Sequence, residues 1–296
     1  LLIFCADNGV VEEGVSQTGQ EVTAAVVSNM TRGRSCSCLM AEKAETDVFP
    51  IDMGIACEVE HRGELHPLTE RKIRRGTSNF TKAAAMTRQE VLTAILTGID
   101  AVRVLKEQGY RLSAVGEMGI GNTTTSSAVA SVLLQKDPEL VTGAGAGLDS
   151  AGLKRKTEAI RRGIGLHHPD PMDGMEVLQK VGGFDLAAMA GAFLGGAIYH
   201  VPVVIDGVIA AAAAAAAGRI APAATDYMLA AHVSAEPASI WLLDLIGVTP
   251  AIQAGLRLGE GTGALALFPL LDMALSIYRD MDTFAEMEIE EYKPLV

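Results

Sequence analysis

The stretch that decides the fold is residues 112–125, LSAVGEMGIGNTTT, in which an apolar run, a glycine loop and the polar start of a helix follow one another. Residues 112–115 predict a short buried strand, and Gly116, Gly119 and Gly121 predict a tight loop after it. A strand that passes through glycines into a helix can hold a phosphate on free backbone N–H groups. The loop has neither the G-K-[ST] of a Walker loop nor the G-x-G-x-x-G spacing, so its specificity as a pattern is modest.

Three other apolar runs end in the same way, with a carboxylate and a glycine. They are Leu2–Ala6 before Asp7, residues 48–51 before Asp52 and Val203–Ile205 before Asp206, and Glu117 ends the run described above. In an open α/β sheet, ligands bind beyond the carboxyl ends of the strands. Each carboxylate alone is equally consistent with a cap on the next helix. Four together predict a shared crevice, with room for one or two structural caps among them.

Helical patterns alternate with these strands. We expect helices over residues 21–29, 88–107, 123–135, 153–162, 172–181, 186–199 and 208–217. The alternation predicts an α/β fold with an open, mostly parallel, Rossmann-like sheet and helices on both of its faces. The eight alanines at 210–217 predict a tightly packed crossover helix, because Ala is the best helix former. We expect an α/β nucleotide-binding domain over residues 1–240 and a C-terminal helical part over residues 241–296.

The composition indicates a packed globular protein. The 296 residues are 49% hydrophobic and carry a formal net charge of −12, with a mean hydropathy of +0.27. This hydrophobic share is too high for a disordered chain. A nucleic-acid surface needs basic patches, so the acidic balance predicts no nucleic-acid partner.

One segment raises the question of a membrane span. Residues 186–205 contain no Asp, Glu, Lys or Arg, and Gly191 and Gly195 fit a small-xxx-small pattern. Ala and Gly supply much of this window, however, and residues 199–202 (YHVP) interrupt it. A helix followed by a short strand accounts for the segment better, so we predict no membrane span.

Cysteine and histidine spacing favours neither a metal nor a disulfide. The four cysteines form no C-x-x-C pair, and the six histidines show no H-x-x-x-H spacing. The segment 232–237, HVSAEP, brings Ser, His and Glu together but lacks a nucleophile elbow. We interpret it as a binding loop and predict no metal site.

Two more glycine clusters are candidates for the site. The loop 141–149, VTGAGAGLD, precedes a helix that carries Lys156, which could reach a phosphate or could lie on a solvated helix face. The second cluster, 257–263, is RLGEGTG. Its Glu260 stands between glycines and has little side-chain cover of its own, which makes it the strongest candidate for a general base.

Together these segments resemble the nicotinate-nucleotide–dimethylbenzimidazole phosphoribosyltransferase family. The matching strings are ADNGVVEEGVS (6–16), IRRGTSNFTKAAAMTRQE (73–90), GEMGIGNTTTSSA (116–128), GGFDLAAMAGA (182–192), PVVIDGVIAAAA (202–213), HVSAEP (232–237) and RLGEGTGALALFPLLDMAL (257–275). They run in order along nearly the whole chain. Departures from the family pattern are Asn8 where His is frequent, Ala144 where Arg is frequent and Ala238 where Gly is usual.

The resemblance implies a role for each matching residue. Glu260 would be the catalytic base and Glu117 the second carboxylate, at the ribose and the leaving base. The nucleotide phosphate would lie among Gly119, Gly145, Gly147, Lys156 and Ser234. The nucleotide pocket would be lined by Asp206, Gly207, Arg257, Gly259 and Gly261, and Met118 and Leu258 would offer apolar surface to the benzimidazole.

The resemblance also implies a reaction and its setting. Phosphoribosyl would pass from nicotinate mononucleotide to 5,6-dimethylbenzimidazole with inversion at C1, in a cytoplasmic homodimer, with small-molecule substrates and no metal or other cofactor. In the family, a longer N-terminal region helps to build a small helical domain, and we expect part of it to be missing here. Two alternatives stay open: a sister phosphoribosyltransferase that uses adenine or a phenol, and a non-catalytic nucleotide-binding regulator.

Overall fold

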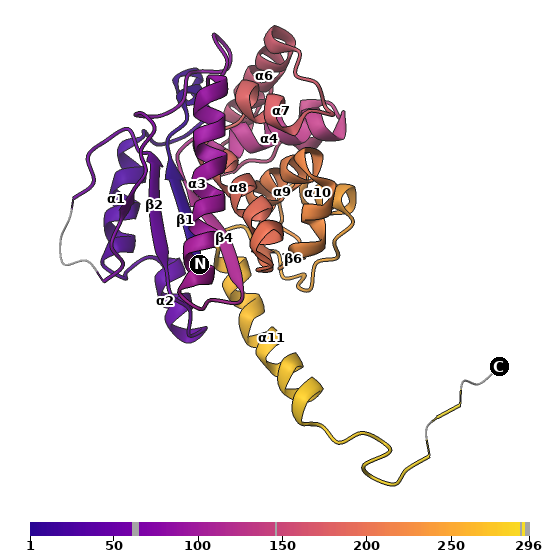
Figure 1. Cartoon of the computed structure of the whole chain (residues 1–296). Helices are drawn as coiled ribbons and strands as arrows, with labels where there is room; N and C mark the ends of the chain where they lie inside the picture. Colours follow the sequence, from indigo (N-terminus) through magenta and orange to yellow (C-terminus); the bar gives the residue numbers. More distant parts are fainter. Residues whose placement is uncertain (61–64, 146, 291, 294–296) are drawn as a thin grey trace.

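A parallel sheet of six strands forms the centre of the computed structural model, which describes residues 1–60, 65–145, 147–290 and 292–293 (Figure 1). The strands lie in the order β3-β2-β1-β4-β5-β6. Their bounds are β1 Leu2–Ala6, β2 Phe49–Gly54, β3 Thr69–Glu70, β4 Ser113–Met118, β5 Val203–Ile205 and β6 Met228–Ala230. This is the strand order of a Rossmann-type sheet, and the predicted fold class is confirmed. The order reverses between β1 and β4.

The strand predictions differ from the structure in length and in number. β1 and β5 have the predicted bounds, whereas β2 and β4 run on far enough to include Asp52 and Glu117. Two edge strands, β3 and β6, were not predicted. They contain two and three residues, which is too short for an alternating pattern to stand out.

Alternate side chains of β1 pack into two separate hydrophobic cores. Leu2 and Phe4 belong to one cluster of buried apolar side chains, while Ile3 and Cys5 belong to the other. Successive side chains of a strand point to opposite faces, so the two clusters cover the two faces of the sheet.

Helices cover both faces, as predicted. The first face carries α3 (Arg88–Glu107), α4 (Asn122–Leu134), α6 (Ser150–His167), α7 (Gly174–Val181), α8 (Phe184–Tyr199), α9 (Val208–Ile220) and α10 (Ser239–Ile246). The second face carries α1 (Glu21–Thr31), α2 (Cys36–Lys43) and α11 (Thr262–Asp280). Short elements complete the chain: α5 (Pro138–Val141) and the 3-10 helices η1 (Gly9–Glu13) and η2 (Pro222–Tyr227). The alanines of α9 are all buried, as expected of a crossover helix.

Close packing against α3 explains the uncharged segment around α8. A Cβ on Gly98 of α3 would lie 1.9 Å from the Ala188 carbonyl oxygen, and one on Gly191 of α8 would lie 2.0 Å from that of Ile95. The two backbones therefore touch directly, and the small residues permit this contact. Among the described residues, no helix has both the length and the apolar character needed to cross a bilayer.

The C-terminal region starts within the body of the protein and leaves it. Helix α10 packs on α9, and the first residues of α11, such as Thr262 and Leu265, are buried. From Leu270 onward α11 is largely exposed, and Figure 1 shows it projecting away from the sheet. The division of the chain at residue 240 stays a prediction.

Candidate active site

A cavity of about 210 Å³ lies at the carboxyl edge of the sheet, where Gly145 and four longer segments line it. It is lined by the end of β4 and the start of α4, the start of α9, the loop 232–236 and the loop 257–260. The predicted site residues that line it are Glu117, Met118, Gly119, Gly145, Asp206, Gly207, Ser234, Arg257, Leu258, Gly259 and Glu260. The other predicted residues, Gly147, Lys156 and Gly261, lie outside its wall.

Only two of the four strand-end carboxylates line this cavity. Asp7 accepts hydrogen bonds from Thr23 Oγ1 at 2.6 Å and from the Ala56 N–H at 2.8 Å, and burial raises its pKa to about 6. Asp52 accepts from the Ile55 N–H at 2.9 Å and lies 3.1 Å from the Lys72 ammonium. Both side chains hold loop backbone in place and neither caps the next helix, so their role is structural but differs from the capping alternative.

Glu117 projects from β4 into the cavity as a buried carboxyl group. Its Oε2 accepts a hydrogen bond from the Asn122 amide, and its Oε1 lies on the side of Gly259. Burial raises the pKa of Glu117 to about 8, and the neighbouring Asp185 acts on it in the same direction. At neutral pH this group therefore favours its protonated form.

Glu260 stands across the same cavity in an unusual backbone conformation. Its φ is +58°, between Gly259 at +87° and Gly261 at +79°, so the chain turns sharply here. Its Oε2 accepts a hydrogen bond from Ser37 Oγ at 3.0 Å and lies 3.4 Å from the Ser37 N–H. Ser37 is in the first turn of α2, and the partial positive charge of a helix start stabilises a carboxylate there. The side chain is half-buried, and its charge acts on the nearby Glu117 carboxyl group.

The Asp206 side chain accepts hydrogen bonds from the backbone that follows Glu260. Its two oxygens accept hydrogen bonds from the N–H groups of Gly261, Gly263 and Ala264, at 3.2, 2.7 and 3.1 Å. Asp206 thus caps α11 from the end of β5, and this explains why Gly261 faces Asp206 and not the cavity. Burial raises the pKa of Asp206, and His232, whose Nε2 is 3.8 Å from Oδ1, opposes that shift.

Lys156 lies directly behind the cavity wall. The side chain is fully buried, so the alternative of a solvated helix face is wrong for it. Its Nζ donates to Thr123 Oγ1 and to the Gly143 carbonyl oxygen, both at 3.0 Å, and a Cβ on Gly145 would lie 3.2 Å from it. Burial lowers the pKa of Lys156 to about 8. Thr123 and Gly145 line the cavity, so only these two residues separate the ammonium group from it.

Gly147 is the most distant of the predicted residues. It is exposed, and its carbonyl oxygen accepts a hydrogen bond from the Gln17 side chain. Nearer the cavity, the Gly145 N–H donates to Glu236 Oε1 at 3.2 Å. In the loop 141–149, Gly145 therefore lines the cavity and Gly147 does not.

Several residues of the site were not predicted. Thr123, Asn122, His232 and Glu236 line the cavity and stand inside motifs that the sequence already emphasised, at 112–125 and 232–237. Ser37 had no such signal, because α2 itself was missed. Asn8, one of the departures from the family pattern, is buried, and within the described part of the chain its Oδ1 has no hydrogen-bond partner.

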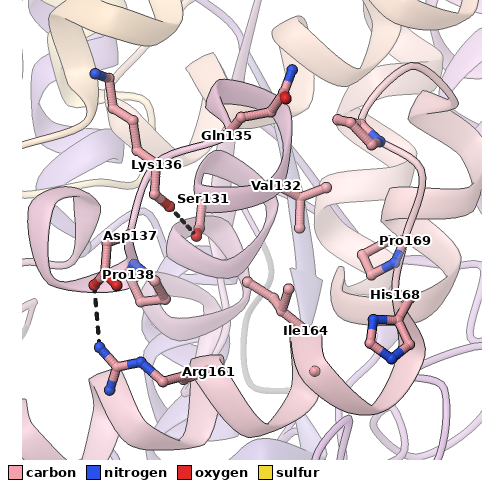
Figure 2. Close-up of a pocket in the computed structure, with 12 residues that line it drawn as sticks. Ser131, Val132, Gln135, Lys136, Asp137, Pro138, Arg161, Ile164, His168 and Pro169 are labelled. Atoms are coloured by element: carbon pink, nitrogen blue, oxygen red, sulfur yellow. Dashed lines mark hydrogen bonds and ion pairs between the residues drawn. The ribbon is translucent and has the colours of Figure 1, made fainter.

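A larger hollow lies elsewhere and has a different character. It has a volume of about 590 Å³ between the end of α4 and α6, and Figure 2 shows its side chains. Arg161 there is engaged with Asp137 at 3.2 Å, and Ser131 Oγ donates to the Lys136 carbonyl oxygen at 2.6 Å. No strand end contributes to this hollow, so we place the candidate site in the smaller cavity.

Metal-binding clusters are not found in the described ranges: no group of three His, Cys, Asp or Glu side chains there is arranged to hold an ion. Of the cysteines, Cys5 and Cys38 are buried, Cys36 is exposed and Cys57 is half-buried, and all are free thiols.

Comparison with known proteins gives one consistent match. A family model described as phosphoribosyltransferase matches residues 1–289. The nicotinate-nucleotide–dimethylbenzimidazole phosphoribosyltransferase of Ruminiclostridium cellulolyticum is 46% identical over 295 residues, covering 100% of this chain and 83% of that protein. The protein of the same name from Clostridium acetobutylicum is 45% identical over the same length and with the same coverage. The crystal structure of CobT from Thermus thermophilus is 39% identical, with a TM-score of 0.92, covering 98% of this chain and 86% of that one.

Proposed function

The chain belongs to the nicotinate-nucleotide–dimethylbenzimidazole phosphoribosyltransferase family, and on this premise we propose that it transfers phosphoribosyl from nicotinate mononucleotide to 5,6-dimethylbenzimidazole. The products are α-ribazole 5′-phosphate and nicotinate. The observation that carries the proposal is that Glu117 and Glu260 line one cavity together with a glycine loop and a helix start.

The reaction needs one proton acceptor. A neutral nitrogen of the benzimidazole attacks C1 of the ribose, and the bond from C1 to the pyridine nitrogen breaks with its electron pair moving to that nitrogen. Nicotinate then leaves with a neutral ring, so no general acid is required. The other N–H of the benzimidazole becomes acidic, and the Glu260 carboxylate accepts its proton. Attack opposite the leaving group inverts β to α at C1.

The electrostatics of the cavity support these roles. Positive charge develops on the ribose ring as the old bond breaks, and a carboxylate on the Glu260 side of the cavity stabilises that charge, whereas Glu117 is mostly protonated at neutral pH. Glu260 Oε2 accepts a hydrogen bond from Ser37 at the start of α2, which holds the side chain of the proposed base in place. We assign phosphate binding to Gly119, Gly145 and Ser234, and leave out Gly147, which is exposed outside the cavity wall. The burial of Lys156 behind Gly145 supports an indirect contribution from that ammonium group.

The remaining predicted residues complete the proposed site. The open wall formed by Gly207 and Gly259 would receive the nucleotide beside Arg257, and Asp206 and Gly261 would hold that wall in place. Met118 and Leu258 are the apolar side chains offered to the benzimidazole.

The test is incubation of the protein with nicotinate mononucleotide and dimethylbenzimidazole, followed by mass detection of ribazole phosphate. Parallel reactions with adenine and with p-cresol show whether a sister activity dominates. Glu260→Gln keeps the shape of the side chain but accepts no proton, so turnover should fall by ~10²–10⁴-fold while the nucleotide still binds. Wild-type rates in E260Q would remove the base assignment. Nucleotide binding without any product from any base would favour the non-catalytic regulator.

We also propose that the protein is a cytoplasmic homodimer. Apolar side chains exposed along α11, among them Leu270, Met273 and Ile277, support an association through this helix. Light scattering on the purified protein measures the oligomeric state, and a monomer at micromolar concentration would refute the dimer.

A further inference from the structure

A single amide in the cavity wall joins two buried carboxyl groups. The Asn122 Nδ2 group donates to Glu117 Oε2 and, at 3.2 Å, to Asp185 Oδ2. Glu117 ends β4, Asn122 begins α4 and Asp185 lies in the first turn of α8, so three distant segments meet here. The exposed fractions are 7% for Glu117, 5% for Asn122 and 0% for Asp185. An NH₂ group has two hydrogens, which suffice for both carboxyl groups at once.

This contact determines which oxygen of Glu117 faces the cavity. Because Oε2 is held by Asn122, Oε1 is the oxygen left for a ligand. Oε1 is also the atom nearest to Gly259, where a Cβ would lie 2.8 Å from it. Gly259 lines the cavity immediately before Glu260. The amide thus leaves one defined oxygen of Glu117 directed toward Gly259 and the cavity.

Asp185 is in turn held from two sides. Its Oδ1 accepts from the Leu186 N–H at 2.9 Å, at the start of its own helix. Its Oδ2 accepts from Asn122 and would lie 3.5 Å from a Cβ on Gly119. With the carboxyl group fixed in this way, the Asn122 amide has one orientation in which both of its hydrogens are used.

The groups that face this trio are mostly acidic. They are Cys5 of β1, Asp7 after β1, Asp206 after β5 with His232 beside it, and Glu260 before α11. Like charges at short range oppose one another's ionisation, while the hydrogen bond from Asn122 favours the carboxylate of Glu117. Asp185 and Asn122 therefore act on Glu117 in opposite directions.

We propose that Asn122 and Asp185 are positioning residues for Glu117. The Asn122 amide determines which Glu117 oxygen contacts the nucleotide, and Asp185 fixes the orientation of that amide. Asp185 does not line the cavity, and Asn122, which does, acts through the Glu117 oxygen that it holds. The inference rests on the proposed function for the identity of that substrate, whereas the coupling among the three side chains is independent of it.

The coupling is tested by infrared titration of the carboxyl bands in the unliganded protein. The step of Glu117 is identified as the one missing in Glu117→Gln. Asp185→Asn removes a like charge, so that step should move to lower pH; Asn122→Ala removes a hydrogen bond to the carboxylate, so it should move to higher pH. Asp52→Asn is the matched control, since Asp52 is also buried but lies within β2 and has its own partners in Lys72 and Ile55. The Asp52→Asn variant should show the Glu117 titration step at the same pH as the wild type.

Opposite shifts are not expected from a general loss of structure, so they would support the proposal. An unchanged Glu117 step in a folded Asp185→Asn protein would overturn it, and so would shifts in the same direction. Should Asn122→Ala not fold, Asn122→Ser takes its place. Kinetics form the second arm: we expect kcat to fall about ten-fold in both variants with KM for nicotinate mononucleotide little changed. A wild type that forms no ribazole phosphate would refute the proposed function and leave the titration result intact.

Discussion

Ser37 Oγ lies 3.0 Å from Glu260 Oε2, across a sequence separation of 223 residues. The hydroxyl donates to the carboxylate at the start of α2, so the proposed base is held by an element on the opposite face of the sheet from α9. The position of the Glu260 side chain therefore depends on a helix that has no other part in the cavity.

Replacing this serine should slow the reaction. A hydrogen bond to a charged group contributes about 1.5–3 kcal/mol, so Ser37→Ala should lower kcat about ten-fold or more with KM for the nucleotide little changed. Steady-state kinetics measures both. Cys36→Ala, an exposed neighbour in the same turn, is the control and should behave as wild type. A Ser37→Ala protein with full kcat would show that Glu260 needs no such support.

Gly259 should tolerate no side chain. Its φ of +87° is costly for other residues, and a Cβ would lie 2.8 Å from Glu117 Oε1. Gly255 has a φ of +64° with open space around it, which makes Gly255→Ala a matched control. Both variants should lose about 1–2 kcal/mol of stability, measured by urea denaturation. Only Gly259→Ala should also lose at least ten-fold in kcat, and equal kinetics in the two variants would contradict the contact with Glu117.

Lys156 should make nucleotide binding depend on pH. Its pKa of about 8 means that the ammonium group loses its proton in mildly alkaline solution. A neutral amine attracts phosphate less, so KM for nicotinate mononucleotide should rise between pH 7 and 9. Lys156→Met keeps much of the volume without the charge. We expect a higher KM in this variant at pH 7 and no further rise, and a wild-type profile in it would rule out the role of Lys156.

The buried carboxyl groups should make the unliganded protein lose stability as the pH rises. Burial raises the pKa of Asp185 to about 7 and that of Glu117 to about 8. The folded chain therefore holds protons that the unfolded chain has released, and the stabilisation present below about pH 4 is lost as the pH passes through 7 and 8. Relative to Asp185→Asn, the wild type should thus lose a few degrees of Tm between pH 5 and 8.5. Calorimetry at matched ionic strength measures this difference, and parallel curves would contradict it.

The sequence predicted the sheet well because long, periodic segments determine it. The patterns at 112–125 and 88–107 yielded β4, α4 and α3 with bounds close to those observed, and in α3 the bounds are the same. What was missed is short or depends on tertiary contacts. The two-residue strand β3 has both side chains exposed, and α2 has little apolar periodicity.

The site was predictable as a set of residues but not as a set of contacts. Glycine loops and strand-end acids indicated which segments meet, since parallel strands bring their carboxyl ends together. Nothing in the sequence distinguished Asp206, which caps α11, from Asp7, which binds Thr23 and Ala56. Those partners come from distant segments, so only the folded chain reveals them.

The two proposed active carboxylates come from segments that are made at very different times. Glu117 leaves the ribosome long before Glu260, and the cavity has no opposing wall until the later loop joins the completed sheet. A nascent chain that has passed β4 therefore has one half of the catalytic pair and no activity. Specific activity should then report the fraction of molecules in which the loop that carries Glu260 has been made and has joined the folded sheet.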